Sequence, residues 1–477
     1  MKTSAKVAIG VTLALFAAAG VIAYRVHSIM HATVSPTHDY PAQVTAITSN
    51  ATKRWTPQGD YQRVINLTQA FTDAEKRLLP PDAPRRPPQF SLDVLRNPGA
   101  DPESDPRELD IARMMLEDHA SSGRLASMQE LPRLVGASRP LAANQPLFGM
   151  PQMELGSFRA ATRAASLTAE RRLAQGDIST LVPTVEQLLA LAVIAGSQPT
   201  AIDSLMGIAI NARAHELIRT ACASRDLDED TAKQLLQLID AYPLPRVRDV
   251  HLETERLILR DIIQWTYTDD GSGNGRFAPA AVAKFASTPA AVSLPMSPSI
   301  VSVIMFDDRK SAERLCDEYF DAAKAQAAQP ARLRDFSSLR ALPNTWGRQQ
   351  LILSIFAPSL ATMISSDTGA QFTRDGTRLL LAIEAYRAKN NRYPASLDDL
   401  VPAILPELPI DEWAPDGRFV YRVLAAPQAD GREFLLYSIG ADKKDDNAKH
   451  IDSALTTDKV PGDYVFNLPP DAMHKPE

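Results

Sequence analysis

Hydrophobic positions recur with a helical period over the middle of this chain. Within residues 107–119, Leu109, Ala112 and Leu116 fall on one face of a helix. Turns containing Gly, Pro, Asp or Ser are short, and short turns between long helices place neighbours antiparallel. The pattern therefore predicts an α-helical domain over residues 106–345. Its further helices are expected at 155–174, 181–196, 200–222, 228–242, 246–267 and 309–330.

The pattern changes toward the C-terminal end. One last long helical stretch carries Leu379, Ile383 and Tyr386 at the spacing of one helix face, which suits packing on a sheet. Residues 418–423 then alternate between apolar and polar positions, as a strand does. Residues 392–413 lie between the two and read RYPASLDDLVPAILPELPIDEW. Their prolines remove backbone donors, so we expect a packed connection from helix to sheet.

Several motifs of this region occur in a fixed order. Pro358 comes before a long helical stretch, Tyr393-Pro394 comes after that helix, and LPELPIDEW precedes the first strand. The segments EFLLYSIGADKKDD at 433–446 and GDYVFNLPP at 462–470 complete the order. Residues 351–467 thereby resemble the pilin-like domain of the type II secretion major pseudopilin, which large exported bacterial proteins also carry. Pro358 stands where a pseudopilin has its helix-kinking proline. The resemblance implies a long helix packed on a small antiparallel sheet.

The chain is therefore expected to be an α+β protein, mainly an α-helical array followed by a pilin-like domain at 346–477. Tyr393 and Trp413 are interpreted as packing anchors of that domain. Pseudopilins begin with a peptidase site and a long apolar helix, whereas the domain here lies far inside the chain. Assembly as an ordinary pseudopilus subunit is not expected.

An acidic loop follows the motif Gly-Ala-Asp. Pseudopilins of this type hold Ca²⁺ with oxygen atoms of the corresponding loop, and hard cations prefer such ligands. The resemblance implies Ca²⁺ as a candidate cofactor, with Asp442, Asp445, Asp446 and Asp463 as its ligands. Lysines at 443 and 444 partly cancel the negative charge, so a solvated loop without an ion is the other interpretation.

The N-terminal residues resemble an export or anchoring segment. Lys2 and Lys6 precede an uncharged run at residues 7–24, which as a helix would be about 27 Å long. Basic residues remain on the cytoplasmic side of a membrane. We therefore expect residues 1–31 to form an inner-membrane anchor with the bulk of the chain in the periplasm. A cleaved signal peptide, and thus secretion, is the alternative. Residues 32–105 are rich in proline and are expected to be an extended spacer.

Charge and cysteine content narrow the function classes. The net charge of −6 argues against a nucleic-acid partner. Two cysteines, Cys222 and Cys316, are too few for a disulfide scaffold or a multi-cysteine zinc site, and could be one disulfide or two buried thiols.

No catalytic or cofactor-binding residue is identified from sequence. None of the eight histidines forms a His-Glu-x-x-His pair, and neither a nucleophile elbow nor a P-loop occurs. Two functions remain as hypotheses. One is a non-catalytic, membrane-tethered scaffold with a pilin-like module, whose partners are envelope proteins engaged in secretion or envelope assembly. The other is an exported hydrolase with catalytic groups in the helical domain.

Overall fold

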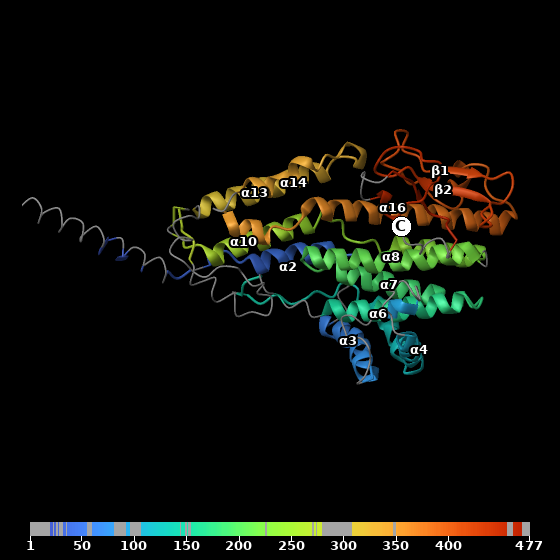
Figure 1. Cartoon of the computed structure of the whole chain (residues 1–477), viewed down its shortest axis with the longest axis horizontal. Helices are drawn as coiled ribbons and strands as arrows, with labels where there is room; N and C mark the ends of the chain where they lie inside the picture. Colours follow the sequence, from blue (N-terminus) through green and yellow to red (C-terminus); the bar gives the residue numbers. More distant parts are fainter. Residues whose placement is uncertain are drawn as a thin grey trace, which may run out of the picture.

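The protein is mostly α-helical, with one small antiparallel sheet near its C-terminal end, as the computed structural model shows (Figure 1). This agrees with the expected α+β class in general. The structure describes residues 20–469 except 22, 25–26, 28–31, 35, 55–59, 81–91, 96–105, 144, 148–149, 151–153, 225–226, 270, 273, 279–307, 347–349 and 456–460.

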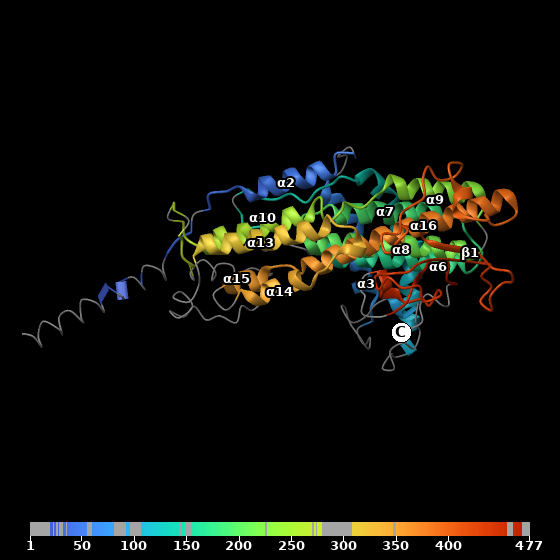
Figure 2. The same ribbon diagram turned by 90° about the horizontal axis from the view of Figure 1, so that it is seen from above.

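The helices of the middle region closely follow the ranges expected from periodicity. Those before residue 251 are α2 (Tyr40–Ala51), α3 (Tyr61–Leu78), α4 (Pro106–Ser121), α5 (Arg124–Ser127), α6 (Glu154–Leu173), α7 (Leu181–Gly196), α8 (Ala201–Ser224) and α9 (Glu229–Ala241). The later ones are α10 (His251–Thr266), α13 (Arg309–Ala327), α14 (Ser337–Thr345), α15 (Leu351–Phe356) and α16 (Leu360–Asn390). Figures 1 and 2 show most of the longer helices lying along the long axis of the molecule.

Side-chain caps fix where several helices begin. The carboxylate of Asp228 accepts a hydrogen bond from the backbone N–H of Thr231, at 2.6 Å, and so starts α9. Asp308 caps α13 in the same way through the N–H of Ser311, at 2.8 Å. Each cap satisfies a donor that the first helical turn leaves without a partner. These local signals explain why the sequence pattern placed both starts correctly.

Helices α7 and α8 form the tightest helix pair at the centre of the array. A side-chain Cβ at position 207 would lie 2.6 Å from the Cα of Gly196 and 2.7 Å from the carbonyl oxygen of Ala192. Only glycine allows two helix backbones to approach so closely. From Gln187 to Gly196 every residue of α7 is buried, as expected for a helix segment enclosed by others.

Helix α16 belongs to two hydrophobic clusters at once. Residues of its first turns, including Leu360 and Ile364, pack with α10, α13 and α14. Its second half, including Leu379 and Ile383, packs with α8, α9 and the sheet. Figure 1 shows α16 lying between the sheet and α8. The same hydrophobic cluster therefore crosses residue 346, where the sequence placed a domain boundary.

The sheet has three strands in the order β1 (Val420–Val423), β2 (Phe434–Ser438) and β3 (Tyr464–Val465). Val423 pairs with Phe434, and Tyr437 pairs with Val465. Every residue of β2 is buried, since Leu436 faces the cluster of α16 while Leu435 lies in a small outer cluster. The Phe466 ring lies so close to α16 that a Cβ at position 376 would be 2.1 Å from it.

Residues 391–413 form the packed connection between α16 and the sheet. Asn391 ends α16 in the left-handed conformation, with φ of 53°. A capping box between Ser396 and Asp399 then closes a single helical turn at Leu397–Leu400. The Trp413 ring stacks on Phe372, with ring centroids 5.9 Å apart. Trp413 is thus a packing anchor, as expected, and so is Tyr393, whose ring centroid lies 4.8 Å from that of Phe434.

The prediction of an extended spacer at residues 32–105 is wrong for the segments that form α2 and α3. Helix α3 places Val64 and Phe71 in the main hydrophobic cluster, and α2 packs along α10 (Figure 2). An amphipathic helix gains more by burying such residues than an exposed spacer would.

The proline-rich stretch after residue 80 lies outside the described residues up to 91, as does most of the apolar run at 7–24. Among the helices described, none combines the length and apolar character that a membrane span requires.

Candidate functional site

The four aspartates expected to hold Ca²⁺ lie in and beside the loop that follows β2. Asp463 is fully buried, and its carboxylate accepts the backbone N–H of Asp446 at 3.3 Å and that of Ala448 at 2.7 Å. Asp445 accepts the hydroxyl hydrogen of Tyr437 at 3.0 Å. Asp442 accepts the N–H of Lys444 at 3.1 Å. These two backbone hydrogen bonds to Asp463 therefore hold the loop in place.

The loop keeps carboxylate oxygens that no hydrogen bond satisfies. Oδ2 of Asp442 and Oδ2 of Asp446 are both buried without a hydrogen-bond partner among the described residues. Burial raises the pKa of Asp463 to about 6, and the nearby charges of Asp445 and Asp446 act in the same direction. Clustered carboxylates with unsatisfied oxygens are the chemistry that a hard divalent cation neutralises. Backbone carbonyls would have to add ligands, because no three acidic or histidine side chains in the described chain gather closely enough to hold a metal ion.

A second polar cluster lies inside the helical array. The guanidinium of Arg139 donates to Glu154 at 2.8 Å and to both carboxylate oxygens of Asp203, at 2.9 and 3.1 Å. The Tyr61 hydroxyl also donates to Glu154, at 3.0 Å. The side chains of Arg139, Glu154 and Asp203 are only 8, 5 and 2% exposed. Such a paired and enclosed cluster joins α3, α6 and α8 and presents little surface to a substrate.

Glu255 lies near Asp203 of this cluster, and no ion pair is found for it among the described residues. Its carboxylate accepts the backbone N–H of Ala201 at the start of α8. Burial, together with the smaller effect of the negative charge of Asp203, raises the pKa of Glu255 to about 7. Residues 251–261 read HLETERLILRD, and acidic and basic residues spaced three and four positions apart are typical of a solvated, salt-bridged helix face. That interpretation holds for Glu253 and Arg256, 2.8 Å apart, but is wrong for Glu255 and Asp261, which are buried.

We expect the stability of the protein to fall between about pH 5 and pH 8, in part because of Glu255. The folded state holds a proton on Glu255 that the unfolded chain releases near its ordinary pKa of 4.5. The contribution of Glu255 to the free energy of unfolding is therefore fully present below pH 4.5. It is lost as the pH rises through about 7. The loss is on the order of 2–3 kcal/mol. Urea unfolding of the full chain at pH 5 and pH 8 measures it.

The variant Glu255→Gln isolates this contribution. Glutamine keeps an acceptor for the Ala201 N–H but cannot ionise, so it should lose about 2–3 kcal/mol less between the two pH values. Glu407→Gln, at an exposed position, serves as the control and should behave like the parent chain. An unchanged pH dependence in Glu255→Gln would show that this carboxyl group does not titrate with folding.

Both cysteines are buried free thiols. Cys222 belongs to the main hydrophobic cluster and Cys316 to the second one, so the alternative of a single disulfide is excluded in this structure. Burial raises the pKa of the Cys316 thiol to about 12 and that of Cys222 well above its ordinary value. Neither thiol is therefore a ready nucleophile at neutral pH.

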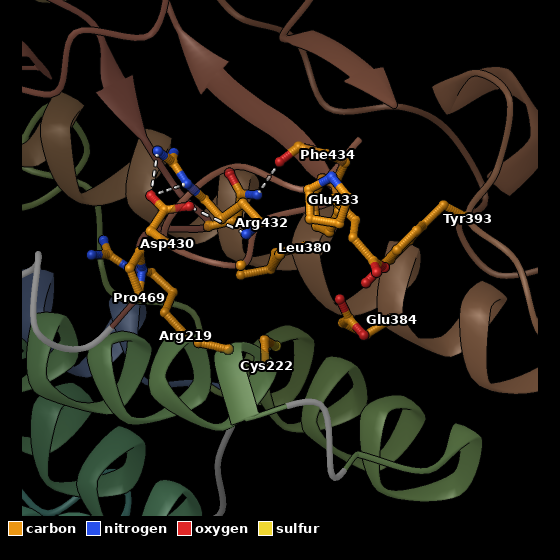
Figure 3. Close-up of a pocket in the computed structure, with 14 residues that line it drawn as sticks. Arg219, Cys222, Leu380, Glu384, Tyr393, Asp430, Arg432, Glu433, Phe434 and Pro469 are labelled. Atoms are coloured by element: carbon orange, nitrogen blue, oxygen red, sulfur yellow. Dashed lines mark hydrogen bonds and ion pairs between the residues drawn. The ribbon is translucent and has the colours of Figure 1, made fainter. Parts of the chain in front are cut away.

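A cavity of about 370 Å³ lies where α8, α16 and the β1–β2 hairpin meet (Figure 3). Helix α8 contributes Arg219 and Cys222, and α16 contributes Leu380 and Glu384. The connection after α16, the hairpin and the final segment complete the wall with Tyr393, Pro427, Asp430, Gly431, Arg432, Glu433, Phe434, Asn467 and Pro469. Its volume falls within the range of small-molecule sites.

Sequence reasoning did not identify this cavity. Its residues come from segments separated by as much as 250 positions, from Arg219 to Pro469. No local motif joins them, because the cavity forms only when the sheet is placed against α8 and α16. Neither the four aspartates of the acidic loop nor Arg139, Glu154 and Asp203 are among its lining residues. No family model, curated protein or solved structure was found to match this chain.

Proposed function

We propose that the chain is a non-catalytic, membrane-tethered and exported scaffold that presents a pilin-like module similar to that of the type II secretion major pseudopilin. One observation carries the proposal: α16, the long helix under the sheet, is also a core helix of the array. Its second half packs on α8, α9 and the sheet together. A module joined in this way has a fixed orientation, which suits a protein that positions partners in the cell envelope.

Two buried groups of paired ionisable residues support a structural role for the helical array. Arg139 binds both Glu154 and Asp203 in an enclosed network, and Arg246 holds Asp367 of α16 at 3.0 Å. A hydrolase would instead need acid, base or nucleophile groups facing a substrate. These carboxylates are engaged by arginines, which favours the scaffold over the exported hydrolase.

Topology is the first test of the proposal. We expect protease added to intact spheroplasts to digest residues 32–477, because the apolar run behind Lys2 and Lys6 directs the rest of the chain outward. Immunoblotting with a C-terminal antibody measures this. Fractionation and the mass of the mature chain distinguish an anchored form from one released by signal cleavage.

A charge in the apolar run provides the matched control. Leu15→Lys places a charge in the middle of the apolar run, which costs about 3 kcal/mol in a membrane-spanning helix. The variant should therefore not be inserted or exported, and it should remain protected from protease. Full protection of the unaltered chain, with an exported marker digested in the same sample, would contradict the proposal.

We also propose that the acidic loop binds Ca²⁺. The two unsatisfied oxygens of Asp442 and Asp446 support this site, and Asp463 lies near Asp445 and Asp446. In the bound state the ion would neutralise these carboxylates and tie the loop to the end of β2. The ion would supply structural stability, and no catalytic step is assigned to it.

Calcium should raise the melting temperature of the full chain. A ligand that binds only the folded state stabilises it by about 2.7 kcal/mol at a hundredfold excess over Kd. Differential scanning calorimetry in EGTA and in millimolar Ca²⁺ measures the shift, and Asp442→Ala should abolish it. Asp416→Ala, an exposed position outside the loop, should leave it intact. Identical melting curves in EGTA and Ca²⁺ would show that the loop does not bind Ca²⁺.

A further inference from the structure

The cavity between α8, α16 and the sheet has charges of opposite sign at its two ends. Figure 3 shows Arg219, Asp430 and Arg432 at one end, and Glu384 and Glu433 with Tyr393 at the other. A ligand that spans the cavity would therefore meet a guanidinium-rich end and a carboxylate-rich end.

The guanidinium end keeps hydrogen-bond donors that the described residues do not use. Nε of Arg219 and Nη1 of Arg432 are buried without a partner. Arg219 is held by the Tyr464 hydroxyl at 2.5 Å and is only 6% exposed. Asp430 is already engaged, because it accepts from Nε of Arg432 at 2.8 Å. Unsatisfied buried donors are costly, and an anionic group is the partner that two guanidiniums recognise best.

The carboxylate end is preorganised rather than flexible. Nε of Arg387 donates to Glu384 at 2.6 Å, and Glu384 is 2% exposed. The oxygens of Glu433 and Tyr393 point toward the same region in Figure 3. Fixed acceptors of this kind suit a primary ammonium group, which carries three donors and no acceptor.

Between the two ends the wall is apolar. Leu380 and Cys222 lie between the charged groups in Figure 3, and Phe434 is a further lining residue. Counting Arg387 with the lining residues gives three arginines, namely 219, 387 and 432, against three acids, namely 384, 430 and 433. The site as a whole is therefore neutral, so it favours separated charges on a ligand over a net charge of either sign.

We propose that this cavity binds a small zwitterion with an apolar body, such as an amino acid or a dipeptide with free ends. The carboxylate of the ligand lies at Arg219 and Arg432, its ammonium group lies at Glu384 and Glu433, and its apolar side chains contact Leu380 and Phe434. This inference goes beyond the scaffold function, because it assigns a small-molecule ligand to the cavity between the helical array and the sheet.

The probe is leucyl-leucine, titrated into the full chain by isothermal calorimetry at pH 7. Its N-acetyl and C-amide forms each retain one charged end. Both should bind at least tenfold more weakly than the free dipeptide, a difference of about 1.4 kcal/mol. Equal binding of the three forms, or no binding of the free dipeptide, would overturn the proposal.

Variants assign each end of the ligand to its end of the cavity. Arg432→Gln should weaken the free dipeptide and the N-acetyl form, whereas Glu433→Gln should weaken the free dipeptide and the C-amide form. Arg418→Gln is the control, since Arg418 is an exposed residue of the same sheet region, paired with Asp398 and absent from the cavity wall. Ala223→Trp, at an exposed lining position, should block the cavity and abolish binding. Full binding in Ala223→Trp would place the ligand elsewhere and contradict the assignment.

Discussion

Replacing Ile383 by Asp should destabilise the full chain by about 4–5 kcal/mol or more and unfold the array together with the sheet. Ile383 is completely buried in the half of α16 that contacts α8, α9 and the sheet. An aspartate there would place an unpaired carboxylate in the cluster that both parts share. Urea unfolding followed by circular dichroism at 222 nm measures the loss in the helices, and hydrogen exchange of peptides from β2 at the same urea concentrations reports on the sheet.

Thr362→Asp is the matched control in the same helix. Thr362 is exposed in the first turn of α16, where a negative charge is favourable near the helix N-terminus. Its free energy of unfolding should change by no more than about 0.5 kcal/mol. The account would be contradicted if Ile383→Asp removed the exchange protection of β2 while the helical array kept the stability of the parent chain.

Gly207→Ala should have the second largest effect, with a loss of about 3 kcal/mol or more. The added methyl group would lie 2.6–2.7 Å from backbone atoms of α7, and backbone atoms cannot rotate away as side chains can. The only relief is to separate α7 from α8 at the centre of the array. Thermal and urea unfolding of the purified variant measure the change.

Gly196→Ala tests whether the close approach itself is responsible. A Cβ at position 196 would meet its nearest atom, on the Leu244 side chain, at 3.4 Å, which is ordinary contact. Alanine is also preferred over glycine in helices by up to about 1 kcal/mol. Gly196→Ala should therefore be neutral or slightly stabilising. Similar losses in the two variants would indicate a general intolerance to substitution instead of a specific backbone contact.

Much of the helical fold could be predicted because local patterns determine it. The run at 181–196 is mostly apolar and matches α7 residue for residue. The start of α9 follows from Asp228, and the end of α16 from the pair Asn390-Asn391. The strand expected at 418–423 begins two residues later in the structure, at Val420. These signals depend on neighbours within a few residues, so they can be seen in one sequence.

The remaining features depend on contacts between distant residues. Helix α3 is amphipathic, but the proline-rich segment that surrounds it favours an extended spacer in a reading of the sequence alone. Glu255 appeared to belong to an exposed charged face, but packing of α8 against α10 buries it. Arg139 and Asp203 are 64 positions apart, and nothing local predicts that they pair. The four aspartates could be named from a family resemblance, whereas the cavity required the placement of the sheet.

Hydrogen exchange of the full chain tests most directly whether α16 joins the array and the sheet into one folded unit. Mass spectrometry of peptides from α8, α9, α16 and β2 at increasing urea concentrations gives the opening free energy of each segment. The account predicts that the most protected amides of all four segments exchange through one common opening, with the same urea dependence. If α16 and β2 instead opened together at a lower free energy while α8 and α9 remained protected, the sheet and its helix would be a separate domain and the account would be wrong.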